Sequence, residues 1–413
     1  MNINLALLAF ALLVGLYSAI NIGANDVANS MATSVASGAL TVKMAVVVAA
    51  VFTFLGAVFV GSHVANTIRK GLIDPSRFAD NPRLLLFGML AAVLASALWV
   101  NIATYFKLPV STTHSIIGAV VGFGLVSVGF GGINWKVVLY VVLSWLVSPI
   151  FGGIIAFSIF SIIKKFILSS PEPISRTKKI GPFFTGIVAF ILSLAVIYKG
   201  LKNLHLNLPF LEALLISLLV GIGGFFLGYM ILRRYRERDY DPYYQVEKMA
   251  NPLQVISASF QAFSHGANDV ANAIGPIAAI VTIIQTQRAE MEVSIPLWVL
   301  FLGGVGLSLG IYTWGHRVME TVGKRITHIT PTRGFSAEFG TATTVLLCSR
   351  LGMPVSTTHT AVGNIIGVGL ARGISAINLD VLKRIFSAWI ITLPAAAIFS
   401  IVIYFALVTF LPS

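Results

Sequence analysis

Three observations on the sequence predict an all-α protein that crosses a membrane many times. Hydrophobic residues make up 57% of the 413 residues and charged residues only 10%, against roughly 25% charged in a soluble domain. The mean hydropathy is +0.89. Apolar runs of about 20 residues, the length that a transmembrane helix needs, recur along the chain. This pattern excludes a soluble protein, which needs a charged surface, and a β-barrel, whose strands alternate apolar and polar residues.

The apolar runs predict about twelve membrane segments. We expect them at residues 3–22, 44–62, 84–106, 109–129, 136–163, 182–199, 210–232, 252–287, 295–316, 336–352, 354–372 and 379–409. The sequence leaves open whether 109–129 and 354–372 span the membrane or re-enter it. The predicted fold class therefore includes broken or re-entrant helices.

The basic residues predict how the chain is oriented in the membrane. The net charge of +13 would indicate nucleic-acid binding in a soluble chain, but here Lys and Arg lie in short loops beside apolar runs. Because such residues are enriched in cytoplasmic loops, a topology with both termini outside fits most of them. The loop at 63–83 is an exception. We predict a multi-pass protein in the lipid bilayer, with extracytoplasmic termini and no nucleic-acid partner.

Two motifs each occur twice, in the same order. Gly-Ala-Asn-Asp-Val-Ala-Asn fills residues 23–29 and 266–272, which start 243 residues apart, and Pro-Val-Ser-Thr-Thr-His fills 109–114 and 354–359, which start 245 apart. Self-similarity at one offset indicates an internal repeat. An odd number of predicted segments lies between the copies, so they enter the membrane from opposite sides. Inverted-topology repeats of this kind are common in secondary transporters, which bind substrate at the repeat interface.

The repeat predicts three parts of the chain. Residues 1–163 form a first inverted repeat, and residues 252–413 form a second one. Between them, residues 164–251 form a linking segment with two membrane helices and basic cytoplasmic loops.

The first motif places a carboxylate at membrane depth. An ionised aspartate at the centre of a membrane helix costs roughly 2.5–3.5 kcal/mol on insertion scales, so Asp26 needs a partner or a function. The neighbouring asparagines add amide oxygens, and such oxygen ligands suit Na⁺ or a proton carrier rather than a soft metal. We predict sodium ligands at Asn25, Asp26, Asn29, Asn268, Asp269 and Asn272. The alternative is a buried aspartate that caps a broken helix.

The second motif predicts a helix N-terminus that binds an anion. Proline is favoured in the first helical turn, Ser and Thr are favoured as caps, and free N–H groups at a helix start attract anions. Inverted symmetry would bring the two copies together. We predict phosphate contacts from Ser111, Thr112, Thr113, Ser356, Thr357 and Thr358, together with Asp26 and Asp269, because a carboxylate accepts a hydrogen bond from protonated phosphate but repels sulfate. The alternative is a pair of capped helices buried for packing.

Three further polar residues lie in apolar segments. His114 and His359 end the second motif, and they either carry protons or pack with a hydrogen bond. Glu338 is a lone intramembrane carboxylate, which is a functional candidate by default. We predict that Glu338 is a further sodium ligand or relay, with a structural pair as the alternative.

These residues resemble the inorganic phosphate transporter (PiT) family. The resemblance rests on both duplicated motifs, on Asn-Thr-Ile-Arg-Lys-Gly at 66–71 and on Gly-Phe-Ser-Ala-Glu at 334–338. It implies cation-coupled phosphate symport, with Na⁺ in many members and H⁺ in others, and it allows a homodimer. Many members carry a glutamate where this chain has Thr53. The short 233–251 linker resembles compact prokaryotic members, which implies the cell (inner) membrane.

We therefore predict a secondary active transporter that carries inorganic phosphate with Na⁺ by alternating access around a midplane site. It is not expected to be an enzyme or to hold a cofactor, and Na⁺ is its coupling ion. The alternative is a proton-coupled phosphate or sulfate carrier. Less favoured are a passive anion channel and an intramembrane aspartyl protease, whose dyad the two aspartates could form.

Overall fold

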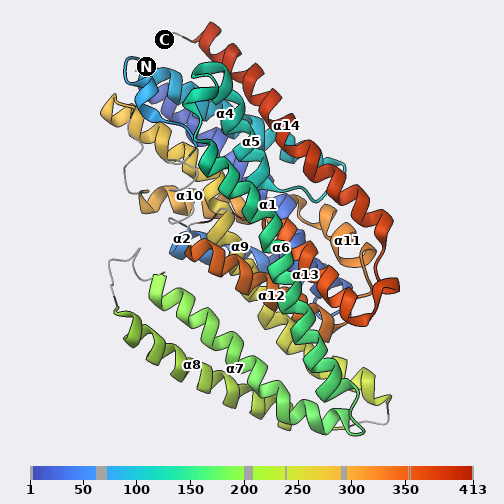
Figure 1. Ribbon diagram of the computed structural model, residues 1–413. Coiled ribbons are helices and arrows are strands. Elements are labelled where there is room, and N and C mark those ends of the chain that lie inside the picture. The colour runs from blue at the N-terminus through green and yellow to red at the C-terminus, as the bar shows by residue number, and fades with distance from the viewer. Residues whose placement is uncertain are drawn as a thin grey trace.

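The computed structural model describes residues 3–61, 72–199, 208–237, 240–289, 295–351, 353 and 355–411. Within these ranges the chain is a bundle of helices (Figure 1). The longer helices are α1 (Ile3–Ala36), α2 (Val42–Val60), α4 (Pro82–Tyr105), α5 (Thr112–Ser127), α6 (Trp135–Ile163), α7 (Pro173–Lys199), α8 (Phe210–Arg233), α9 (Pro242–Thr286), α10 (Leu297–Trp314), α11 (His316–Arg325), α12 (Pro331–Arg350), α13 (Thr357–Arg372) and α14 (Leu379–Phe410).

Every predicted membrane segment contains a helix, and nine helices in the described ranges are long and apolar enough to cross a membrane. The all-helical, polytopic membrane fold class is therefore confirmed, while the inverted repeats remain a prediction. The two segments left open correspond to α5 and α13, which have 16 residues each. At 1.5 Å per residue such a helix is about 24 Å long, short of a hydrocarbon core of about 30 Å. Helix α11 lies in the stretch between the ninth and tenth predicted segments.

The first motif lies inside unbroken helices. The apolar pattern predicts that the first segment ends at residue 22, but α1 continues to Ala36. Helix α9 begins ten residues before the predicted segment and is 45 residues long. Gly23 therefore matters because it has no side chain, which lets α1 approach α10 closely. A Cβ at this position would overlap the carbonyl of Leu307 in α10.

The two halves of the chain make matching contacts. Gly23 in α1 touches the backbone of Leu307 in α10, and its counterpart Gly266 in α9 touches the backbone of Thr53 in α2. Helices α5 and α13 also each pack on a helix of the other half of the chain, α5 on α14 and α13 on α6. These are the contacts expected when a two-fold axis relates two copies of one unit.

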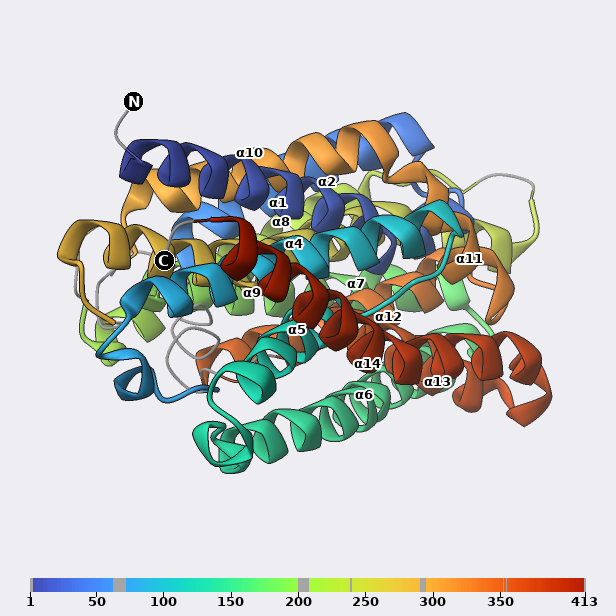
Figure 2. The same ribbon diagram turned by 90° about the horizontal axis from the view of Figure 1, so that it is seen from above.

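Helices α1 and α9 cross in opposite directions. Gly15, early in α1, faces Ile277, late in α9. Farther along α1, the backbone carbonyl of Asn29 accepts a hydrogen bond from the amide of Gln261, early in α9. Both ends of the described chain lie at the same end of the bundle (Figures 1 and 2).

Helices α7 and α8 form a hairpin in the predicted linking segment. They pack tightly on each other, and α7 also contacts α9. The pair lies along one edge of the bundle, opposite α14 (Figure 1). Helix α7 reaches the second copy of the first motif, because Leu192 and Val196 pack in one cluster with Ala267 of α9.

Candidate functional site

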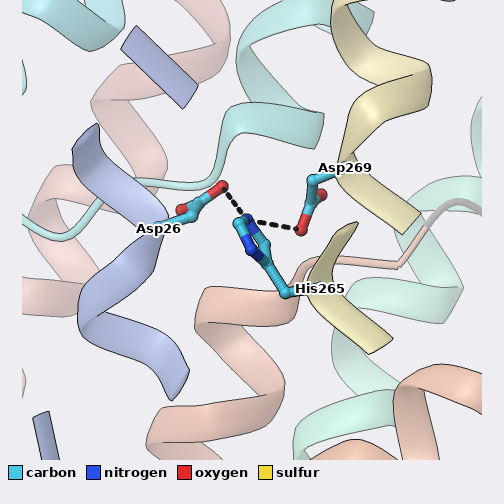
Figure 3. Close-up of side chains that lie close together, drawn as sticks. All are labelled: Asp26, His265 and Asp269. Atoms are coloured by element: carbon cyan, nitrogen blue, oxygen red, sulfur yellow. Dashed lines mark ion pairs between the residues drawn. The ribbon is translucent and has the colours of Figure 1, made fainter. Parts of the chain in front are cut away.

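Two carboxylates and one imidazole meet where α1 crosses α9. Asp26 and Asp269 are fully buried, and His265 projects between them (Figure 3). The Nε2 atom of His265 lies 3.8 Å from Oδ2 of Asp26 and 3.6 Å from Oδ2 of Asp269. An ionised carboxylate taken out of water costs several kcal/mol unless a cation or hydrogen-bond donors compensate it. The negative charge of the two buried aspartates therefore needs compensation by a cation or by hydrogen-bond donors.

The second motif begins two helices, as predicted. The hydroxyl of Ser111 caps α5 by accepting a hydrogen bond from the His114 N–H at 3.2 Å. Ser356 caps α13 in the same way, with the His359 N–H at 3.1 Å. Since each serine oxygen is engaged by its own helix, the following threonines are the hydroxyls presented to the carboxylates.

Each carboxylate receives a threonine hydroxyl from its own half of the chain. Thr112 donates to Oδ2 of Asp26 at 2.8 Å, and Thr357 donates to Oδ2 of Asp269 at 2.9 Å. Thr358 comes from the other half and lies 3.3 Å from Oδ1 of Asp26. The two helix starts and the two aspartates thus form one connected site.

Asn29 and Asn272 tie the halves together. The amide of Asn29 donates to Asp26 at 3.1 Å and to Thr358 at 3.0 Å. The amide of Asn272 donates to Asp269 at 2.9 Å and to Thr113 at 3.2 Å. Their amide oxygens are buried and have no hydrogen-bond partner among the described residues. An unpartnered oxygen beside a carboxylate is suited to a hard cation.

In the other two asparagines of the motif the side-chain oxygen is engaged, although the Asn268 amide also donates to Oδ1 of Asp269 at 3.0 Å. Asn25 donates to Thr104 at 2.9 Å, and its oxygen accepts from the N–H of Val110 at 3.3 Å. The oxygen of Asn268 accepts from Ser349 at 3.2 Å, and its amide donates to the Val355 carbonyl at 3.0 Å. These bonds hold the extended residues ahead of α5 and α13 against α1 and α9. Their oxygens are therefore engaged, unlike those of Asn29 and Asn272.

Glu338 lies in a separate polar cluster. This α12 carboxylate accepts hydrogen bonds from four side chains of α1 and α9, which are Thr33 at 2.6 Å, Ser34 at 2.7 Å, Ser257 at 2.6 Å and Gln254 at 3.2 Å. The predicted cation ligands thus divide into two sets. Thr53 lies on α2, with its hydroxyl 3.2 Å from the Ala262 carbonyl and 3.4 Å from Nδ1 of His265, so it contacts the first set only through that histidine.

The two histidines of the second motif contact aromatic rings. His114 lies on Trp145 and His359 on Trp389, each with ring centroids 3.5 Å apart. The two imidazoles are neighbours, with centroids 4.3 Å apart. Each imidazole thus packs against an indole ring behind the start of α5 or α13, with its Nε2 atom unpartnered among the described residues.

His265 was not among the predicted site residues. A signal was present in the sequence, because this histidine directly precedes the second copy of the first motif, where the first copy is preceded by Ile22. Of the other predicted features, the 66–71 motif and Pro354 lie outside the described residues.

The fold and the site define a polytopic membrane protein with a buried cluster of carboxylate, amide and hydroxyl groups. The chain belongs to the phosphate transporter family, whose profile matches residues 22–400. It is a transporter and not an enzyme, and the family resemblance read from the motifs is confirmed.

Similar proteins cover nearly the whole chain. A Pyrococcus abyssi protein named as a candidate phosphate permease is 48% identical over 397 residues, which cover 96% of this chain and 97% of the relative. A Haemophilus influenzae protein of the same description is 42% identical over 399 residues, with 96% and 95% covered. A solved structure of a protein described as the sodium-dependent phosphate transporter aligns with a TM-score of 0.92 and 43% identity, covering 98% of this chain and 100% of that one.

Proposed function

We propose that the protein carries inorganic phosphate with Na⁺ through two inverted repeats, at residues 1–163 and 252–413, that alternate access to the site between α1 and α9. The opposite directions of α1 and α9 support this arrangement. The sodium dependence of the 43% identical transporter of known structure supports Na⁺ as the coupling ion.

The observation that carries the proposal is that two buried carboxylates lie in hydrogen-bond contact with the starts of α5 and α13. Phosphate would bring a third negative group to the same buried place. Since like charges repel strongly at low dielectric, cations must bind with it. Coupling between phosphate and a cation follows from this charge balance.

The site offers suitable ligands for both ions. For Na⁺ these are the oxygens of Asp26, Asp269, Asn29 and Asn272, and Asn25 and Asn268 act by holding the backbone. For phosphate they are the hydroxyls of Thr112, Thr113, Thr357 and Thr358 and the N–H groups at two helix starts, while Ser111 and Ser356 act as caps. Glu338 would form a second cation site with the hydroxyls around it.

The test is uptake of radiolabelled phosphate into proteoliposomes of the purified protein. An inward Na⁺ gradient is compared with a K⁺ gradient at fixed pH, and sulfate is added as competitor. We expect accumulation that needs Na⁺ and resists sulfate. Accumulation driven by a pH gradient without Na⁺ would assign the carboxylates to protons, and flow that never exceeds equilibrium would indicate a channel.

A further inference from the structure

His265 has a contact pattern that packing alone does not explain. The side chain is buried and its Nε2 atom has no hydrogen-bond partner among the described residues. Its two nearest carboxylate oxygens, at 3.6 and 3.8 Å, lie beyond hydrogen-bond distance. Buried polar atoms are nearly always paired. The Nε2 atoms of His114 and His359 are also unpartnered, but those rings pack on indoles, whereas Nε2 of His265 lies between two carboxylates.

The histidine is also the asymmetric part of a symmetric site. The aspartates, the asparagines and the threonines all occur in both copies, whereas the position before the first copy is Ile22. One imidazole between two carboxylates serves both halves at once. His265 can therefore interact with both aspartates at the same time.

The groups around the imidazole determine which ring nitrogen carries the hydrogen. Nε2 faces two negative oxygens, and an N–H is favoured there over a lone pair. Nδ1 lies 3.4 Å from the hydroxyl of Thr53. The single hydrogen of that hydroxyl can point to Nδ1 or to the Ala262 carbonyl at 3.2 Å, and the lone pair that Nδ1 carries when Nε2 is protonated favours the first. With Thr53 behind it, His265 presents Nε2–H to the centre of the site.

We propose that His265 is a donor shared between the carboxylates and phosphate, an inference that rests on the proposed function. Without Na⁺ its Nε2–H faces Asp26 and Asp269. When Na⁺ ions occupy the aspartates, the N–H is released and donates to a phosphate oxygen. Phosphate binding then depends on prior Na⁺ binding through one hydrogen atom, with no change in the protonation of the ring.

The proposal predicts opposite changes in the affinities for Na⁺ and phosphate in a variant without this donor. In His265→Leu the aspartates lose a competitor for Na⁺, so Na⁺ binds more tightly in the absence of phosphate. Phosphate loses a donor, so at saturating Na⁺ it binds more weakly, by about tenfold or more for one hydrogen bond to a charged acceptor. The two affinities move in opposite directions, whereas structural damage would weaken both.

The experiment measures equilibrium binding of ²²Na⁺ and of radiolabelled phosphate to the purified full-length protein in detergent. His265→Gln keeps an N–H donor and should show smaller shifts than His265→Leu. Thr53→Val removes the hydroxyl behind Nδ1 and should shift both affinities in the same directions as His265→Leu. The matched control is His316→Leu, which changes an exposed histidine on α11 and should alter neither affinity.

Each outcome decides the proposal. Opposite shifts in His265→Leu, reduced in His265→Gln, support it. Weaker binding of both ions, or unchanged phosphate binding, overturns it. If His265→Leu does not fold, the Thr53→Val variant decides: unchanged affinities overturn the proposal, and opposite shifts support it. A wild-type protein that binds phosphate equally with and without Na⁺ would instead refute the proposed sodium coupling.

Discussion

Replacing Thr112 and Thr357 by valine tests whether the starts of α5 and α13 bind phosphate. Valine keeps the branched shape of threonine and removes the hydroxyl, which in the structure donates to Asp26 at 2.8 Å or to Asp269 at 2.9 Å. When Na⁺ occupies the carboxylates, these hydroxyls are free to donate to phosphate. Each substitution therefore removes one donor to a charged acceptor.

The magnitude follows from the energy of such a bond. A hydrogen bond to a charged group contributes about 1.5–3 kcal/mol, and a factor of ten corresponds to about 1.4 kcal/mol. Each single variant should raise the phosphate concentration for half-maximal uptake by about tenfold or more. Because the two positions are related by the repeat, Thr112→Val and Thr357→Val should have similar effects. The double variant should be worse than either, though not additive, since both hydroxyls act on one ligand.

The assay is initial phosphate uptake at saturating Na⁺, at matched amounts of reconstituted protein. The control is Thr282→Val on α9, where the hydroxyl is buried but bonds the carbonyl of Ala278 in its own helix at 2.9 Å. We expect no change in half-saturation there. Half-saturation within twofold of wild type in Thr112→Val and Thr357→Val would refute the assignment of these hydroxyls to phosphate.

Four other substitutions follow from the site and the packing. Asp26→Asn and Asp269→Asn should each abolish Na⁺-driven accumulation while inserted protein remains at the wild-type level on a blot, and retained uptake would exclude these carboxylates from coupling. Glu338→Gln should change the Na⁺ concentration for half-maximal uptake while phosphate affinity at saturating Na⁺ stays within about threefold; an unaltered Na⁺ dependence would leave Glu338 a structural role. Gly23→Ala should lower the melting temperature, because overpacking costs typically about 1–3 kcal/mol and the obstacle is a backbone carbonyl. Gly131→Ala has open space for its Cβ and serves as its control; equal melting temperatures for the two would contradict the predicted contact.

The sequence determined the membrane class and the positions of most helices. Hydrophobicity over about 20 residues is a local property that follows directly from bilayer thickness. The duplicated motifs also identified the carboxylates and the hydroxyl-rich helix starts, because two copies in one order left little room for coincidence. The caps at Ser111 and Ser356 were predictable for a similar reason, since a helix start depends on a few adjacent residues.

Helix continuity was harder to predict. The polar motif at 23–29 reads as the end of an apolar segment, yet α1 runs on to Ala36. Hydropathy treats a polar residue as one that needs water. In the structure most polar groups of the motif are hydrogen-bonded inside the protein, as Asp26 is by Thr112 of α5 and Thr358 of α13, so the helix continues through the interior.

Only the tertiary structure decided which members of the predicted set have free ligand atoms. Asn25 and Asn29 belong to one motif, but the first holds the chain before α5 and the second keeps an unpartnered oxygen. Glu338 proved to belong to another cluster. His265 and Asp26 are 239 residues apart in the sequence and become neighbours because α1 crosses α9. Such contacts depend on the angle and register of packed helices, which the sequence of either helix alone does not contain.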